Sequence, residues 1–152
     1  MPGPVEVKAN VHQAFKDSVV SHRSEEFIRD FFLLKDKLTG IVGSRFAQIF
    51  MGSGTMANDV IAAQLKQISG TGLIISNGEF GERLIDHAKS ANIDFDQITF
   101  EWGDYFDYGY INRYLDSKPP PSWIWVVNCE TSTGVLNNIN DLTVLSEKYQ
   151  SK

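Results

Sequence analysis

The sequence predicts an α/β protein with a mostly parallel sheet and flanking helices. From Arg45 onward, short apolar runs alternate with stretches in which apolar residues recur at helical spacing. One run, residues 123–127, is apolar on both of its alternating faces, as expected of a strand that is covered on both sides. Strands that alternate with helices favour parallel pairing, and ligands then bind at the carboxyl ends of the strands.

Composition narrows the classes of function. The chain has 152 residues, of which 42% are hydrophobic and 22% are charged, as in ordinary globular proteins. Its formal net charge of −5 comes with no basic stripe, so we expect no nucleic-acid partner. No apolar run approaches the length of a membrane span, and no terminal stretch resembles a signal peptide. Together with a single cysteine, Cys129, these features predict a cytoplasmic protein that does not contact membranes.

The chain is expected to begin with an extended arm over residues 1–20 and to continue as a domain over residues 21–152. The opening, residues 1–5, is too rich in proline and glycine for a helix. Such arms usually lie on the protein surface or on another subunit.

The first elements of the domain are expected to be a helix, a strand and a second helix. Acidic residues follow Ser24, and apolar residues at helical spacing predict a helix that ends near Gly40 or Gly43. An apolar strand is expected over residues 47–51. It leads through the glycine turn at residues 52–55 into a helix with an apolar face.

Three strands and three helices are expected in the remainder. The strands are predicted at residues 73–76, 97–100 and 123–127. The helices are predicted around residues 84–88 and 110–115 and from about residue 142 to the chain end, and residues 128–140 are expected to form a loop.

The glycine turn before the second helix is a candidate phosphate site. Glycines on both sides of Ser53 let the backbone approach a ligand, and the first amides of a helix have no intrahelical acceptor. The hydroxyls of Ser53 and Thr55 add two donors. The same residues equally suit a plain turn in which Ser53 or Thr55 caps the helix, so the motif alone leaves both interpretations open.

Three predicted strand ends carry small, polar or aromatic residues: residues 53–55, 77–83 and 128–134. In a parallel sheet these ends lie on the same rim, so one ligand could touch all three. This convergence favours a binding site over three unrelated turns.

In this order, the motifs Gly-Ser-Gly-Thr, Asn-Gly-Glu-Phe-Gly-Glu-Arg and Glu-Thr-Ser-Thr-Gly-Val-Leu-Asn resemble class V aminotransferases. These are pyridoxal 5'-phosphate enzymes of fold type I, such as the alanine–glyoxylate, serine–pyruvate and 2-aminoethylphosphonate transaminases. The resemblance covers essentially the whole chain, including residues 21–24 and the Pro-Gly-Pro opening. It implies the N-terminal part of the large domain, pyridoxal phosphate as cofactor, a small amino acid or aminophosphonate as donor, a 2-oxo acid as acceptor, and a homodimer.

Carried over residue by residue, the resemblance implies that Ser53, Gly54 and Thr55 hold the cofactor phosphate. Phe80 matches a family aromatic residue that stacks on the pyridine ring. Thr131 matches a Ser or Thr that hydrogen-bonds the phenolic oxygen of the cofactor. Without the resemblance, Phe80 better suits a core residue that opens a helix, and Thr131 better suits a hydroxyl that stabilises a turn.

Other residues near these motifs are expected to play supporting roles. Glu130 and Arg83 could form an ion pair, and Cys129 could pack as a small apolar residue at the ligand rim. No residue of the chain is assigned a catalytic role, and no metal site is expected.

The resemblance also implies what this stretch of sequence lacks. In the family, the Schiff-base lysine and the acid that pairs with the pyridinium nitrogen follow the Glu-Thr-Ser-Thr-Gly segment, and no lysine of this chain lies in a matching motif. The 152 residues are therefore expected to be inactive alone, and to self-associate or to bind the C-terminal half through exposed apolar surface. The alternative is a complete, non-catalytic α/β module that binds a phosphorylated small molecule or a protein partner.

Overall fold

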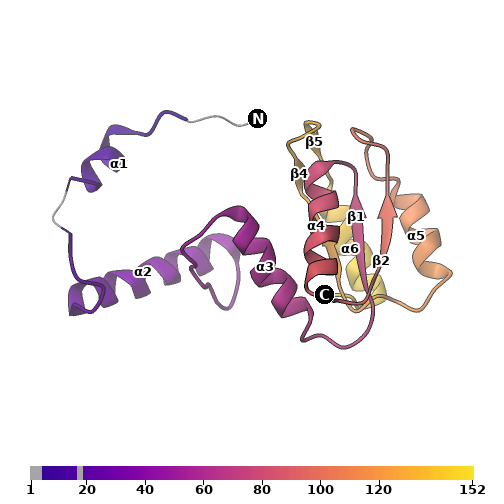
Figure 1. Ribbon diagram of the computed structural model, residues 1–152, viewed down its shortest axis with the longest axis horizontal. Helices are drawn as coiled ribbons and strands as arrows, with labels where there is room; N and C mark the ends of the chain where they lie inside the picture. The colour runs from indigo at the N-terminus through magenta and orange to yellow at the C-terminus, as the bar shows by residue number, and fades with distance from the viewer. Residues whose placement is uncertain (1–4, 17–18) are drawn as a thin grey trace. The chain divides into compact units, whose positions relative to one another are not determined.

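The computed structural model describes residues 5–16 and 19–152, which form two compact units that meet in the sequence between Met51 and Gly52 (Figure 1). The proline-rich start of the expected arm, residues 1–4, lies outside the described residues, as do residues 17 and 18. Within the described ranges, no helix combines the length and the apolar character needed to cross a membrane.

In the first unit, the described residues 5–16 and 19–51 include two helices. Helix α1, Ala9–Ala14, lies within the stretch that was expected to be an extended arm. Helix α2, Glu25–Val42, matches the predicted amphipathic helix, and its start is capped by Ser24 Oγ, which accepts a hydrogen bond from the Phe27 amide at 3.2 Å. It ends at Gly43, whose φ of +63° is the left-handed conformation that glycine adopts most easily.

The predicted strand at residues 47–51 is wrong, because the structure has no strand there. The apolar side chains suggested one, but a strand also needs a neighbour to accept and donate its backbone hydrogen bonds. Among the described residues, the parallel sheet is formed only by strands that begin at or after Gly72.

The second unit, Gly52–Lys152, is built on this sheet, whose strand order is β2-β1-β3. Strands β1 and β2 lie side by side in Figure 1. Strand β1, Gly72–Ser76, lies in the centre and pairs in parallel with β2, Phe95–Thr99, and with β3, Ile124–Val126. The predicted strands lie within two residues of these bounds. Parallel pairing requires crossover connections, and helices supply them.

Helices cover both faces of the sheet. They are α3, Gly54–Leu65; α4, Glu79–Ser90; α5, Tyr108–Asp116; and α6, Ile139–Tyr149. Leu73 and Ile75 of β1 pack in one core with residues of α5 and α6, whereas Ile74 packs in the other core with residues of α3 and α4. This alternation places β1 between two helical layers, so its side chains are buried on both faces.

A short hairpin follows β3. Strands β4, Cys129–Glu130, and β5, Val135–Leu136, pair in antiparallel fashion around a turn that contains Gly134 at a φ of +77°. The prediction of a loop over residues 128–140 is therefore wrong at the hairpin and at the start of α6. Two-residue strands are too short to give an alternating pattern that the sequence could reveal.

Candidate functional site

A cavity of about 540 Å³ lies within the second unit, between α3, α4, β3 and the β4–β5 hairpin. All three sequence motifs contribute to its wall: Gly54 and Thr55 from the first, Phe80 and Arg83 from the second, and Thr131 from the third. Cys129, which directly precedes the third motif, also lines the cavity. The structure therefore brings together segments that are far apart in the sequence. Two of the segments follow β1 and β3, whose ends lie on the same rim of the parallel sheet, whereas Gly54 and Thr55 begin α3 with no strand before them in the described part of the chain.

The glycine turn opens α3 next to this cavity. Ser53 is the N-cap of the helix, and its Oγ accepts a hydrogen bond from the Met56 amide at 3.3 Å. Gly54 and Thr55 line the cavity, whereas Ser53 is not among the lining residues. Around Gly54 the space is open, because a Cβ atom placed there would have no heavy atom within 4 Å. The start of α3 thus leaves room for an anion beside the first amides of the helix.

Phe80 lies in the first turn of α4 and presents its ring to the cavity. Its side chain is 37% exposed, so it is not a core residue within this chain. The guanidinium of Arg83 lies over the ring at 5.2 Å from its centroid, and Arg83 Nη2 is 2.9 Å from Glu79 Oε1. Phe80 is therefore an exposed aromatic side chain, with the Arg83 guanidinium packed against one face of its ring.

The predicted ion pair between Glu130 and Arg83 is wrong. Glu130 is fully buried, and its Oε2 accepts a hydrogen bond from the Gly81 amide at 3.0 Å. Its Oε1 accepts bonds from the amide of Ser132 at 3.2 Å and from the hydroxyl of Ser132 at 2.5 Å. Amides at a helix N-terminus that have no intrahelical acceptor attract a carboxylate. The Glu130 carboxylate therefore bonds to the start of α4 and not to the exposed guanidinium of Arg83.

A buried pair of amide side chains, Asn77 and Asn137, joins the strand ends and was not predicted. Asn77 Nδ2 donates to Asn137 Oδ1 at 2.9 Å and to the carbonyl of Asp104 at 2.8 Å. Asn137 Nδ2 donates to the carbonyl of Val127 at 2.8 Å. The one available signal was the position of Asn77, a polar residue directly after a buried apolar strand.

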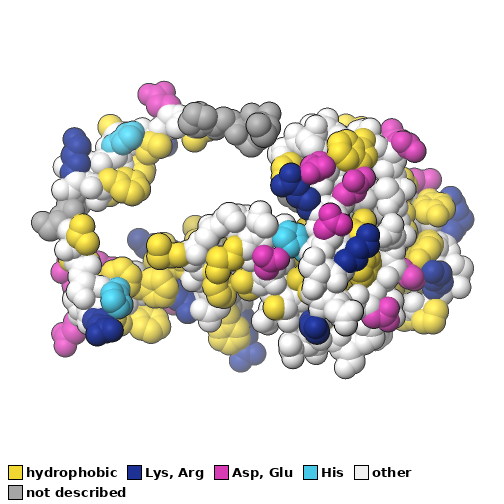
Figure 2. Space-filling model, viewed as in Figure 1, with side chains coloured by type: hydrophobic (Ala, Val, Ile, Leu, Met, Phe, Trp, Pro, Cys, Tyr) yellow, Lys and Arg dark blue, Asp and Glu magenta, His cyan; other side chains and the backbone are white. Residues whose placement is uncertain are grey.

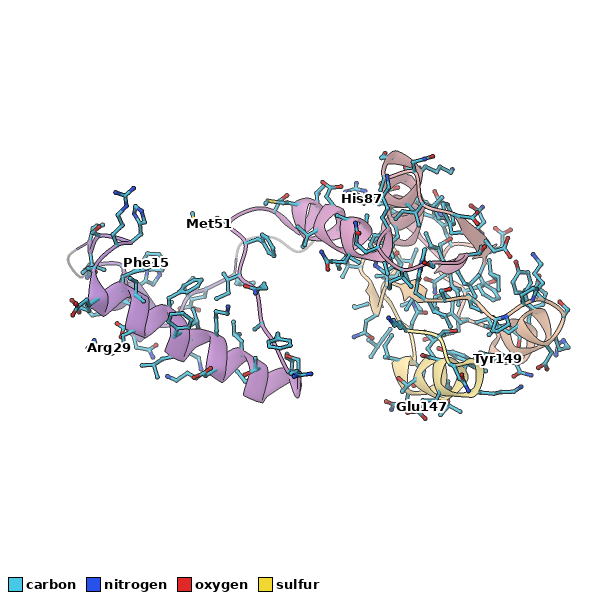
Figure 3. The ribbon with its side chains drawn as sticks, turned by 90° about the horizontal axis from the view of Figure 1, so that it is seen from below. Phe15, Arg29, Met51, His87, Glu147 and Tyr149 are labelled. Carbon is cyan, nitrogen blue, oxygen red and sulfur yellow. The ribbon has the colours of Figure 1, made fainter. Side chains whose placement is uncertain are left out.

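His87 and Asp59 connect the two helices beside the cavity. His87 Nδ1 lies 2.6 Å from Asp59 Oδ1, which joins α4 to α3, and His87 is one of the residues that line the cavity. Figure 3 labels the position of His87. The pair is ionic when His87 is protonated. Sequence reasoning missed it because the two residues are 28 positions apart, on different helices.

Further contacts between titratable side chains lie elsewhere on the second unit. A smaller cavity, of about 240 Å³, is lined by the starts of β1 and β2 and by the segment after α5. There a hydrogen bond from Lys118 Nζ, at 2.9 Å, lowers the pKa of Asp96, and a hydrogen bond with the Tyr114 hydroxyl raises the pKa of Lys118. In the part of the chain that the structure describes, no three His, Cys, Asp or Glu residues are grouped to hold a metal ion.

Comparison with known proteins finds aminotransferases in both sequence and structure. No family model matches the chain. An uncharacterized aminotransferase of Methanocaldococcus jannaschii is 27% identical over 155 residues, which cover 99% of this chain and 40% of that protein. A 2-aminoethylphosphonate–pyruvate transaminase of Bacteroides fragilis is 23% identical, over 99% of this chain and 43% of that protein. The crystal structure of alanine–glyoxylate aminotransferase from Nostoc sp. aligns with a TM-score of 0.83 at 25% identity, over 98% of this chain and 40% of that chain.

The chain thus spans about two fifths of the length of the relatives named above. The likeness confirms the expected resemblance to the N-terminal part of aminotransferases. It also confirms the fold class, an α/β unit with a parallel sheet and flanking helices.

Proposed function

We propose that these 152 residues form the N-terminal part of the large domain of a class V, pyridoxal-phosphate-dependent aminotransferase. One observation carries the proposal: the three motifs that resemble this family converge on a single cavity of about 540 Å³. That cavity offers a helix N-terminus for a phosphate, an exposed aromatic face for a ring, and the hydroxyl-bearing Thr131.

Each predicted residue has a distinct part in this proposal. Ser53, Gly54 and Thr55 bind the cofactor phosphate at the start of α3, with Ser53 also fixing the first turn of the helix. Phe80 contacts the face of the pyridine ring, and Thr131 donates a hydrogen bond to its phenolic oxygen. When bound, pyridoxal phosphate supplies an electron sink for the substrate carbon. These residues would bind and orient pyridoxal phosphate. Transamination also requires the Schiff-base lysine, which none of them supplies.

The chain itself is not expected to transaminate. None of the described residues that line the cavity is a lysine, so no side-chain amine borders the proposed ring position. For the whole protein we propose transfer of an amino group from a small amino acid or aminophosphonate to a 2-oxo acid. This choice follows the relative that is named as a 2-aminoethylphosphonate–pyruvate transaminase. A homodimer and a cytoplasmic location belong to the same proposal.

Ligand binding to the purified chain tests the proposal. We expect pyridoxal phosphate to quench the fluorescence of the cavity tryptophan Trp125, and pyridoxal, which lacks the phosphate, to bind at least tenfold more weakly. Borohydride should not fix the ligand to the chain. Equal affinity for the two compounds, or a stable reduced adduct on a lysine of this chain, would contradict the proposal. Equally tight binding of unrelated phosphorylated molecules would instead favour a non-catalytic phosphate-binding module.

A further inference from the structure

The two proposed ring contacts lie on separate parts of the fold. Phe80 belongs to the first turn of α4, and Thr131 follows β4 in the hairpin turn. A cofactor ring bound between Phe80 and Thr131 needs the two side chains at a fixed separation, because shifting either by about 1 Å strongly impairs how the ring is positioned. The structure therefore has to couple the hairpin to the helix.

Hydrogen bonds join the immediate neighbours of these two residues. The amide of Glu79, which precedes Phe80, donates to Ser132 Oγ at 3.2 Å. The amide of Gly81, which follows Phe80, donates to Glu130 Oε2 at 3.0 Å. Glu130 and Ser132 in turn flank Thr131, and they are bonded to each other through the Ser132 hydroxyl at 2.5 Å.

The start of α4 has little room to shift within this arrangement. A Cβ atom on Gly78 would lie 2.6 Å from Glu130 Cγ, and one on Gly81 would lie 2.6 Å from Ser76 Cβ. The helix start is therefore in close contact with the hairpin on one side and with the end of β1 on the other. Because Glu130 is fully buried, solvent cannot replace the hydrogen bonds that its carboxylate accepts from the amides of Gly81 and Ser132.

We propose that Glu130 and Ser132 are positioning residues that hold Phe80 and Thr131 at the separation which the cofactor ring requires. The inference rests on the proposed function, because Phe80 and Thr131 contact a ring only if the cavity binds pyridoxal phosphate. It also assigns different tasks to the two helix starts. The first turn of α4 is occupied by a carboxylate of the protein, so the phosphate is left to α3.

The test measures binding of pyridoxine 5'-phosphate, which keeps the ring, the phenolic oxygen and the phosphate but has no aldehyde. Ser132→Ala removes the acceptor of the Glu79 amide and one donor to Glu130. We expect its dissociation constant to rise about tenfold, the effect of losing one hydrogen bond to a charged group. Ser132→Thr restores the hydroxyl and should return the affinity to within about threefold of the wild type.

Ser122→Ala is the matched control. Ser122 Oγ also donates a hydrogen bond, to the carbonyl of Ser69 at 2.7 Å, but it lies before β3, away from the cavity lining. Its loss should leave the dissociation constant within about twofold. Amide hydrogen exchange of Glu79 and Gly81, measured without ligand, should accelerate in Ser132→Ala and not in Ser122→Ala.

The possible outcomes separate the two proposals. If the wild-type chain does not bind pyridoxine phosphate, the proposed function fails, and the positioning role fails with it. If the wild type binds and Ser132→Ala binds equally well, or no more weakly than Ser122→Ala, the positioning role alone is overturned. Unchanged exchange at Glu79 and Gly81 in Ser132→Ala would likewise overturn it.

Discussion

Gly81, in the first turn of α4, shows how one residue decides whether a helix can approach a strand. A Cβ atom at this position would lie 2.6 Å from Ser76 Cβ and 2.8 Å from Ser76 Cα, and the latter is backbone that cannot rotate away. Glycine here is required by close approach and not by an unusual φ. The residue therefore sets the distance between α4 and the end of β1.

We expect Gly81→Ala to destabilise the second unit by about 1–3 kcal/mol, because the added methyl group overpacks a site with no free space. Gly54→Ala is the matched control, since Gly54 also lies in the first turn of a helix but has open space around it. That change should alter stability by less than about 1 kcal/mol. Urea unfolding followed by tryptophan fluorescence measures both, and equal effects of the two variants would contradict the packing argument.

At the scale of elements, charge pairs join segments that neighbour each other in the fold but not in the sequence. Lys118, after α5, contacts Asp96 of β2 at 2.9 Å, and Lys148 of α6 contacts Asp116 of α5 at 3.2 Å. The side chains of each pair are 44–53% exposed, so solvent screens the charges and each pair contributes little to stability. Their clearer effect is on carboxylate titration.

We expect Lys118→Met to raise the pKa of Asp96 toward its ordinary value, because the hydrogen bond from Lys118 is the largest cause that lowers it. A depressed folded pKa means that the stabilisation is present above the unfolded pKa and is lost as the pH falls through the folded value. The variant should therefore flatten the acid side of the stability curve slightly. Carboxyl NMR titration measures the shift.

Lys148→Met provides the reciprocal control for this titration. The hydroxyl of Tyr149 and then the ammonium of Lys148 lower the pKa of Asp116, so this variant should raise the pKa of Asp116 and leave that of Asp96 unchanged. A shift of Asp96 in Lys148→Met, or none in Lys118→Met, would show that the specific contacts do not govern the titration.

At the scale of the whole molecule, the main feature is apolar surface that the chain leaves exposed to solvent. Helix α2 has no buried residue, and large apolar side chains before Gly52 are exposed, among them Ile41 at 80%, Phe46 at 74% and Met51 at 95%. Figure 2 shows apolar side chains gathered on this surface. Contiguous exposed apolar surface of this kind usually marks contact with another chain or segment.

We expect the isolated chain to self-associate through this surface. Sedimentation velocity at increasing concentration should show growth of species larger than the 17.1 kDa monomer. Phe46→Asp should reduce the association, whereas Val144→Asp, a change at a residue of α6 that is 64% exposed, should not. A monodisperse monomer at high concentration would contradict this expectation.

The sequence was sufficient for features whose cause is local or follows from topology. The run Leu73–Ser76 and the run around Trp125 identified strands, and parallel order was enough to predict that Phe80 and Thr131, which follow β1 and β3, would meet at one cavity. Thr55 lines the same cavity although no strand precedes it among the described residues. The predictions that were wrong concerned contacts between residues that are distant in the sequence. The strand expected at residues 47–51 lacks a neighbour, and Glu130 found the amide of Gly81 in place of Arg83.

The central position of β1 has a consequence for how the chain folds. Its two neighbours come from later in the sequence: Leu73 pairs with Asp96 on one side and with Ile124 on the other. Closing the larger of these loops carries an entropy penalty before any contact compensates it, so β3 is expected to dock late and slowly. The hairpin follows β3 directly, and Thr131 cannot face Phe80 until this docking is complete. We therefore expect the cavity to assemble only after β3 has docked, and a partly folded chain in which β3 is not docked to have no complete ligand site.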